Sequence, residues 1–388
     1  MIRLRKGMRL LMSAIDLSGA SDELKLMLKT ALGDRANDRD AIVEYAVQQV
    51  SFGGALLKAV APELLSDSGR LLYGMAPKLV YAIPGYEYLA EQLVALSNGK
   101  LELGKEERKR HKDGKGWQRF LTNVTRRHVI IVGATMTDTD QMEMYKLGCN
   151  AQMCKARRIT FLITYHGDAR QERAQLSGES VDGLHTSLQI AKIPQCPDGN
   201  EVLLVDIHDN TIVGFYQGAE IRCRNIDILP KLIDHVGTNY FGGKKCLAAS
   251  PDAGRGKLVW KAAKILKFDF AIASKFRSAT SGATETAGLI GNVRGRNVMT
   301  CDDIGNSLGS ATGVGALLKK KRAKRSVLVV THAAIPGAKY VHDFFETGLF
   351  EALFITDSLN GANELAAQFP GRVHVIPLAP LLVSEVLG

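Results

Sequence analysis

The stretch CDDIGNSLGS, residues 301 to 310, joins two adjacent carboxylates to a loop of small side chains. Asp302 and Asp303 repel each other, so a buried pair calls for a cation, a metal or a polyhydroxyl ligand that compensates the charge. The loop from Asn306 to Ser310 has short side chains and a glycine, so its backbone N–H groups can surround an anion. Carboxylates beside an anion cradle indicate a sugar phosphate site. The alternative is a polar strand-to-helix turn with an acidic helix cap.

A helix is predicted directly after this loop, in the segment ATGVGALLKKKRA, residues 311 to 323. Its positive amino end would face the same anion. Its basic end belongs to the run KKKRAKR, residues 319 to 325, which resembles a nuclear-import or nucleic-acid patch. This run continues a helix and lacks interleaved aromatic residues, which favours a solvated helix end, so no nucleic-acid partner is expected.

Short apolar runs alternate with helical stretches through most of the chain, and several runs end in a polar or acidic residue. Continuous apolar runs are typical of parallel strands that are buried on both faces. The expected fold class is therefore α/β with doubly wound parallel sheets, in which ligands bind at the carboxyl ends of the strands. The runs are residues 127–135, 158–166, 201–208, 245–252, 269–275, 297–303, 326–332, 351–358 and 373–379.

The first part of the chain has a different pattern. Residues 1–76 place apolar residues at helical spacing behind Ser or Asp caps, as in SDELKLMLKTAL, and carry no residues with an evident chemical role. The expected organisation is a helical N-terminal extension at residues 1–76 followed by two α/β domains at residues 77–225 and 226–388.

Polar motifs at the ends of the apolar runs occur in a fixed order: DARQER (168–173), DIHDN (206–210), SPDAGRGK (250–257), SKFR (274–277) and the opening loop. In order and spacing they resemble the motifs of the ribose-phosphate diphosphokinase, or phosphoribosyl pyrophosphate synthetase, family. The resemblance extends from about residue 77 to the end of the chain. It implies two phosphoribosyltransferase-like domains and an enzyme that transfers the β,γ-pyrophosphoryl group of Mg-ATP to the 1-hydroxyl of ribose 5-phosphate, releasing AMP.

The resemblance also implies a role for each motif. Lys275, as the catalytic lysine, and Arg277 would supply positive charge to the phosphoryl transition state, which needs neutralised charge and aligned groups. Arg277 would also touch the sugar phosphate. The stretch after them, SATSGATETAGL, looks suited to closing over the site. His208 and Asp252 match the family's magnesium positions, although Mg²⁺ prefers oxygen ligands.

The remaining implied contacts divide between the two substrates. Those for ATP are Asp113, Gly114, Lys115, Arg170, Gln171 and His208. Those for the ribose phosphate are Arg277, Asp302, Asp303, Asn306, Ser307, Leu308, Gly309 and Ser310. The family usually forms dimers and hexamers that share the ATP site between subunits, so the charged, exposed loop at residues 104–116 is expected to reach a neighbouring subunit.

The sequence departs from the family pattern near the expected ligands. Asn306 replaces an acid of the sugar-phosphate loop, and Arg255 replaces a glycine. His111 replaces an aromatic residue and Lys115 a glutamate in the nucleotide loop. These changes leave two alternatives open: the same chemistry on a larger acceptor such as ADP-ribose, or a non-catalytic regulatory member of the family.

The composition limits the classes of partner. The formal net charge of the 388-residue chain is +10, which fits a small anionic substrate as well as a nucleic acid. No apolar run reaches the roughly 18 residues that span a bilayer, so a cytoplasmic protein without a membrane partner is expected.

Overall fold

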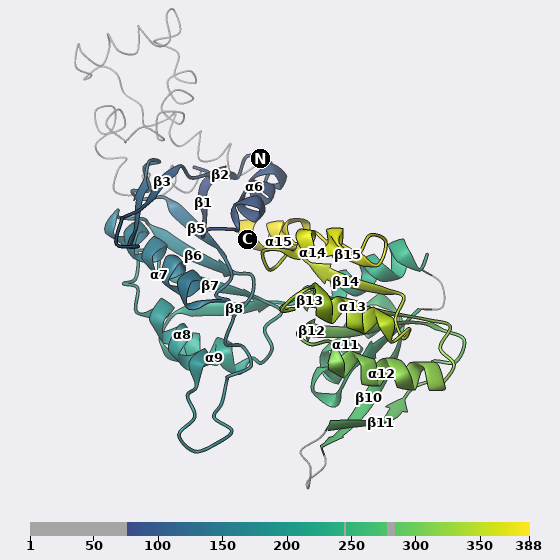
Figure 1. Ribbon diagram of the computed structural model, residues 1–388. Coiled ribbons are helices and arrows are strands. Elements are labelled where there is room, and N and C mark those ends of the chain that lie inside the picture. Colours follow the sequence, from purple (N-terminus) through teal and green to yellow (C-terminus); the bar gives the residue numbers. More distant parts are fainter. Residues whose placement is uncertain (1–75, 244–245, 278–283) are drawn as a thin grey trace, which may run out of the picture.

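Figure 1 shows the computed structural model, which describes residues 76–243, 246–277 and 284–388. The expected helical extension, residues 1–76, lies almost entirely outside the described residues. No helix in the described ranges is long and apolar enough to cross a membrane.

The first half of the described chain is built on a six-stranded sheet with the order β2-β1-β5-β6-β7-β8, in which every pair of neighbours is parallel. Its strands are β1 (Lys78–Ala82), β2 (Leu101–Leu103), β5 (His128–Gly133), β6 (Arg158–Ile163), β7 (Asn200–Val205) and β8 (Arg222–Ile226). Its helices are α6 (Glu87–Leu96), α7 (Asp138–Met153), α8 (Asp182–Ala191) and α9 (Thr211–Gly218).

The second half is built on a seven-stranded sheet with the order β11-β10-β9-β12-β13-β14-β15, which is parallel except for the β10–β11 pair. Its strands are β9 (Cys246–Ser250), β10 (Asp269–Arg277), β11 (Thr284–Ile290), β12 (Asn297–Ile304), β13 (Arg325–His332), β14 (Ala352–Thr356) and β15 (Val373–Ile376). Its helices are α11 (Ala253–Leu266), α12 (Gly309–Lys320), α13 (Ala338–Glu346), α14 (Ala362–Ala367) and α15 (Ala379–Leu387), and α10 (Leu229–His235) with the π-helix η4 (Val236–Tyr240) connects the halves.

Helices cover both faces of the second sheet, as a doubly wound fold requires. Successive side chains of a strand point to opposite faces. Leu247 and Ala249 of β9 pack with Val314 and Leu318 of α12, whereas Cys246 and Ala248 join the core that contains Val259, Ala262 and Ala263 of α11. The expected α/β architecture is therefore confirmed, while the expected domain boundaries remain predictions.

The two halves share one hydrophobic core, because the cluster that begins at Leu79 of β1 extends to Val386 of α15. The C-terminal helix α15 packs against α6 of the first half, and Figure 1 shows the two side by side. The Nζ atom of Lys78 donates to the carbonyl oxygens of Val386 and Leu387 at 2.9 and 3.1 Å. These contacts join the amino end of β1 in the first half to the last helix of the second half.

Two stretches for which no strand was predicted contain one. Within the charged segment 104–116, which was expected to be an exposed loop, β3 (Glu106–Arg110) forms an antiparallel hairpin with β4 (Gly116–Phe120). The second stretch, residues 278–289, was expected to close over the site, and its residues from Thr284 onward belong to β11. Residues 278–283 lie outside the described residues.

Candidate functional site

Several predicted site residues come together where the carboxyl end of the first sheet contacts that of the second. We call this contact region, which contains the pairs His208–Asp303 and Arg170–Ile304, the seam. His208 follows β7 of the first sheet, and Asp303 lies near the end of β12 of the second. The Nδ1 atom of His208 is 2.5 Å from Oδ2 of Asp303, so the two halves contact each other through predicted ligand-binding residues. The His208 side chain is 37% exposed, whereas that of Asp303 is 3% exposed. The histidine ring is therefore accessible to solvent while its partner carboxylate is buried.

A second contact crosses the same seam. The Nη2 atom of Arg170, on the loop after β6, donates to the carbonyl oxygen of Ile304 at 3.3 Å. Asp168 holds this loop in place by accepting hydrogen bonds from Gln141 of α7 and Thr186 of α8 at 3.0 and 2.5 Å. The exposed Arg170 therefore lies beside the end of β12, where the predicted sugar-phosphate loop begins.

The loop from residue 306 to residue 310 has the geometry of an anion cradle. Its five backbone N–H groups have no hydrogen-bond acceptor within the described part of the chain. Gly305 anchors the start of the loop, since its N–H donates to the carbonyl of His332 at 2.9 Å. The loop leads directly into α12, whose amino end adds a favourable dipole for an anion.

Leu308 gives this loop its shape. Its φ of 60° lies in the left-handed region, which is costly for a leucine. Its side chain is only 4% exposed and packs with Ala311 and Leu328, so core packing holds the backbone in this conformation. The leucine side chain thus faces the protein interior, and only its backbone could contact a ligand.

Asp302 lies four residues before the cradle and is half-buried, whereas its neighbour Asp303 is buried. Its Oδ1 accepts the backbone N–H of Asp303 at 3.0 Å, which fixes the orientation of the carboxylate. A carboxylate beside free N–H donors can bind the hydroxyl groups of a ligand whose anionic group occupies the cradle.

Lys275 and Arg277 lie on the part of β10 that extends beyond its neighbour. β10 pairs with β9 only from Asp269 to Ile272, and the following residues pair with β11, after a register shift between Ser274 and Lys275. Asp252 lies between β9 and α11. The backbone therefore places all three residues at the carboxyl edge of the second sheet.

The structure does not bring the predicted ATP residues of the hairpin to this seam. Asp113, Gly114 and Lys115 form the hairpin tip. The base of the hairpin contacts Ala82 at the end of β1 and Glu143 of α7, whereas His208 follows β7. Three strand intervals separate β1 from β7, which corresponds to about 14 Å, and Figure 1 shows β3 on the side of the first half that is remote from the second half. Within one chain, the tip and the seam are separate.

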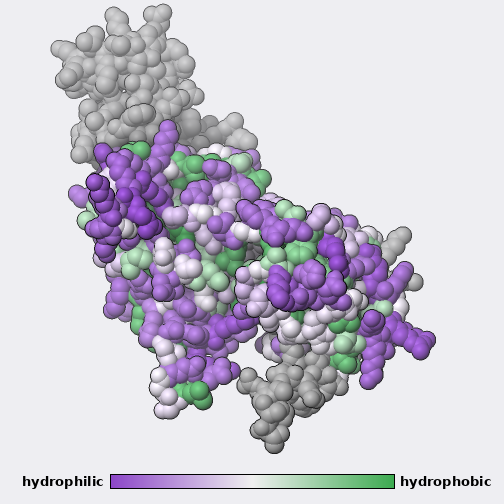
Figure 2. Space-filling model, viewed as in Figure 1, coloured by the Kyte–Doolittle hydropathy of each residue, from purple (hydrophilic) through white to green (hydrophobic). Residues whose placement is uncertain are grey.

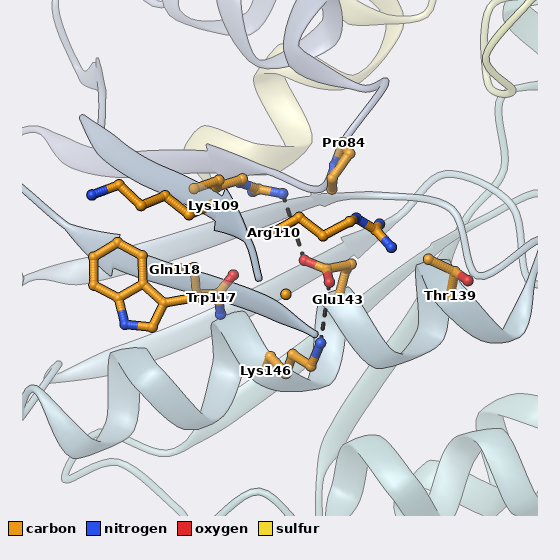
Figure 3. Close-up of a pocket in the computed structure, with 10 residues that line it drawn as sticks. Pro84, Lys109, Arg110, Trp117, Gln118, Thr139, Glu143 and Lys146 are labelled. Atoms are coloured by element: carbon orange, nitrogen blue, oxygen red, sulfur yellow. Dashed lines mark hydrogen bonds and ion pairs between the residues drawn. The ribbon is translucent and has the colours of Figure 1, made fainter. Parts of the chain in front are cut away.

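A pocket of about 310 Å³ lies at the base of this hairpin, between β3, β4 and α7 (Figure 3). Glu143 of α7 points into the pocket and pairs with Lys146 at 3.3 Å and with Arg108 of β3 at 3.7 Å. Arg110 and Trp117 also line the pocket. These ion pairs hold the base of the hairpin against the body of the first half and leave its tip exposed.

Sequence reasoning assigned no role to several buried polar residues at the seam. The Asp206 carboxylate accepts from the Thr331 hydroxyl at 2.6 Å and from the N–H of Ile228 at 2.8 Å. His332 contacts the carbonyl of Val205 at 3.1 Å and the hydroxyl of Ser358 at 2.9 Å. Each stands at or just after a strand end, which is the signal that could have identified them.

Burial at the seam changes the pKa of one neighbouring side chain, the phenol of Tyr165. Tyr165 is buried, and its ring lies 5.0 Å from that of His332. Desolvation raises the pKa of Tyr165 above its usual value, against the opposing influence of Arg170. This tyrosine therefore stays neutral at physiological pH and serves as a packing residue of the seam.

The described residues contain no group of three or more His, Cys, Asp or Glu side chains that could hold a metal. His208 already uses Nδ1 for its contact with Asp303. The donor set therefore fits a magnesium ion that takes most of its ligands from water and from the phosphates of a bound nucleotide, which is common for Mg²⁺.

Comparison with known proteins agrees with this arrangement. Residues 79–187 match the model of the N-terminal domain of ribose phosphate pyrophosphokinase. The ribose-phosphate pyrophosphokinase of Ralstonia nicotianae is 29% identical over 301 residues, which cover 76% of this chain and 90% of the relative. That of Hyphomonas neptunium is 28% identical over 289 residues, which cover 74% and 88%.

The fold is also shared with a solved structure. Phosphoribosylpyrophosphate synthetase from Mycobacterium smegmatis superposes with a TM-score of 0.67 at 20% identity, and the match covers 80% of this chain and 97% of that one. Its similarity supports the two-sheet architecture described above. In its matched N-terminal domain and over most of the length of these relatives, the chain is therefore similar to ribose-phosphate pyrophosphokinases.

Proposed function

We propose that this protein is an enzyme that transfers the β,γ-pyrophosphoryl group of ATP to the 1-hydroxyl of ribose 5-phosphate, giving phosphoribosyl pyrophosphate and AMP. The observation that carries the proposal is the cradle at residues 306 to 310, with its free N–H groups beside Asp302. Arg170 and His208 lie across the seam from it. The names of the relatives support the same reaction.

The acceptor occupies the second-sheet side of the seam in this proposal. Residues 306 to 310 hold the 5-phosphate through backbone N–H groups, and Asp302 binds ribose hydroxyl groups. The acceptor's 1-hydroxyl then points toward the first sheet, where Arg170, Gln171 and His208 bind ATP. Lys275 and Arg277 neutralise the charge that develops on the transferred group.

Magnesium belongs to the proposal as the partner of ATP. Asp252 and His208 would hold the Mg-ATP complex, and the ion would neutralise phosphate charge during transfer. The chain's own contribution is to align the two substrates and to exclude water, because this reaction needs little covalent help from the protein. A cytoplasmic location is part of the same proposal.

An assembly of chains would complete the ATP site. The hairpin tip at Asp113 to Lys115 cannot reach the seam of its own chain, but it extends from the body on an ion-paired base. We therefore assign the tip to the ATP site of a neighbouring copy in a homo-oligomer, as a dimer or hexamer would allow.

The test of the acceptor is to measure AMP release from Mg-ATP with ribose 5-phosphate or ADP-ribose, in the parent and in Asn306→Asp. We expect ribose 5-phosphate to support the faster reaction. The added carboxylate should weaken both acceptors by about 1 kcal/mol through repulsion at a hydrated site. Faster AMP release with ADP-ribose would identify the larger acceptor, and no AMP with either acceptor would indicate a regulatory subunit.

A further inference from the structure

A dense group of positive side chains lies at the end of the second sheet that is remote from the seam. The amino ends of β12 and β13 meet the carboxyl end of α12 there. Six exposed cations from these segments form what we call the basic edge. They are Arg294, Lys319, Lys320, Lys321, Arg322 and Lys324.

The fold, and not only the helix end, gathers these charges. The N–H of Gly295 donates to the carbonyl of Arg322 at 2.9 Å, and the N–H of Lys324 donates to the carbonyl of Arg296 at 2.8 Å. β12 and β13 start side by side, with Asn297 opposite Arg325. The loop before β12 and the loop after α12 are therefore held together by backbone hydrogen bonds.

Acidic groups at this edge pair with cations outside the set of six. Asp269 pairs with Arg296, and Glu351 pairs with Arg325 at 2.6 Å. Across the described ranges, the six members of the basic edge form no ion pair. Figure 2 shows strongly hydrophilic side chains over this end of the molecule, at the right of the view. The edge therefore presents a net charge of +6 to solvent, and the like charges repel one another.

The row of cations extends along the sheet. Exposed Lys267 precedes β10, and the neighbouring strands β10, β9, β12 and β13 separate it from Lys324. Three strand intervals span about 15 Å. A nucleic-acid strand carries one charge per roughly 3.4 Å, so the row matches the length of about four successive phosphates.

The side chains around the row favour a polyanion over a lipid surface. Among the described residues, segments 294–296 and 319–324 contribute no large exposed apolar side chain, and the exposed Ile265 lies only at the far end of the row, close to Lys267. Stable binding to a membrane surface needs apolar groups that enter the lipid in addition to positive charge. Binding to a phosphate backbone needs only the charges.

We propose that the basic edge binds the phosphate backbone of nucleic acid without sequence preference. The sequence alone favoured a solvated helix end, because only the run 319–325 was visible as a basic segment. The structure adds Arg294 and Lys267 from other segments, and within the described part of the chain these cations form no ion pair. The 12 residues of α12 place the edge about 18 Å from the cradle, so a bound nucleic acid leaves the seam open.

The test compares two triple variants of the full chain that each lose three charges. Lys319→Gln, Lys321→Gln and Lys324→Gln weaken the basic edge. The matched control carries Lys100→Gln, Lys155→Gln and Lys192→Gln, at exposed lysines of the first half. Both variants should retain AMP release at the parent's rate, which verifies that they are folded.

Binding is measured by fluorescence anisotropy with labelled duplex DNA and RNA of about 20 base pairs between roughly 50 and 200 mM salt. We expect salt-dependent binding by the parent and the control. The edge variant should bind at least tenfold more weakly, and the slope of log K against log salt should decrease by about 2 to 3. Equal binding by both variants, or no binding by the parent, would overturn the proposal. Charge-dependent binding to phosphatidylserine vesicles without binding to nucleic acid would overturn it in favour of a lipid surface.

Discussion

At the residue scale, the contact between His208 and Asp303 connects the two halves of the protein through a side chain that we propose binds ATP. The resemblance assigned Asp303 to the ribose together with Asp302. Neighbouring residues of a strand point to opposite faces, and in β12 this alternation buries Asp303 beneath His208 and leaves Asp302 half-buried. A sequence can indicate that alternation, but it cannot show a partner 95 positions away.

Asp303→Asn should impair the reaction more than the fold. The amide keeps the size of the carboxylate but loses the charge that orients His208. We expect kcat/KM for ATP to fall roughly 10- to 100-fold, as when the carboxylate partner of a functional histidine is removed. The control is Asp234→Asn on α10, whose exposed carboxylate accepts a hydrogen bond from the Thr238 hydroxyl. A loss below twofold in Asp303→Asn would show that His208 needs no anchor.

A buried histidine near the site predicts acid sensitivity. His166 is 2% exposed, and neither ring nitrogen has a hydrogen-bond partner in the described structure. Burial lowers the pKa of His166 to about 4. The folded protein therefore keeps the ring neutral, while the unfolded chain takes up a proton below about pH 6.5. The stability that depends on the neutral ring is complete above that pH and is lost as the pH falls toward 4.

Replacement of the ring should remove this dependence. Between pH 6.5 and 5, the parent should lose about 2 kcal/mol of unfolding free energy through His166, at 1.36 kcal/mol per pH unit. His166→Phe should lose less over the same range in denaturant titrations, whatever its stability at neutral pH. His235→Gln, at an exposed position, serves as the control. Identical pH dependence in parent and His166→Phe would mean that the ring is already protonated in the folded state.

At the scale of elements, the apolar runs predicted the strands that matter for the site. Runs that are buried on both faces are visible in the sequence, and β5, β6, β7, β9, β12 and β13 all lie within or close to them. β3 was missed because its residues, EERKR, are all charged. It is a strand because the Arg108 guanidinium bonds to Glu106 and to the carbonyl of Ala82, which are contacts that local patterns cannot show.

The loop after β6 offers a test of how elements position the site. Gly167 precedes Asp168 and Arg170, and a Cβ at this glycine would lie 2.2 Å from the carbonyl oxygen of Thr135. Gly167→Ala should therefore displace the loop, lower the melting temperature by several degrees and raise KM for ATP. The control, Gly214→Ala on α9, has no atom near the added Cβ and should stabilise by about 0.5 to 1 kcal/mol. An unchanged KM for ATP in Gly167→Ala would show that this loop does not contribute to nucleotide binding.

At the scale of the whole molecule, the two halves act as one framework. The shared core and the seam contacts place the cradle of one sheet opposite Arg170 and His208, which we propose bind the nucleotide. The sequence indicated both halves and the order of their motifs. It could not show that Asp206, Thr331 and His332 join the halves, because each is paired across more than 100 residues.

The shared ATP site predicts complementation between inactive chains. Lys275→Ala lacks the charge that we propose acts on the transferred group, and a chain with Asp113→Ala and Lys115→Ala lacks the charged side chains of the hairpin tip. Each variant alone should release little AMP. When they are mixed and allowed to exchange subunits, sites that combine an intact seam with an intact tip should recover up to about a quarter of the parent activity, as random pairing predicts. If subunit exchange is verified and no activity is recovered, the hairpin tip does not contribute to the ATP site of a neighbouring chain.

The most direct test of the central claim is to follow the phosphorus atoms of ATP by ³¹P NMR in the presence of Mg²⁺ and ribose 5-phosphate. We predict that AMP and a new pyrophosphate group on the ribose appear in equal amounts, and that Lys275→Ala forms both at least a thousandfold more slowly. Formation of ADP with a single phosphate on the sugar, or consumption of ATP at the same rate without ribose 5-phosphate, would contradict the proposed pyrophosphoryl transfer.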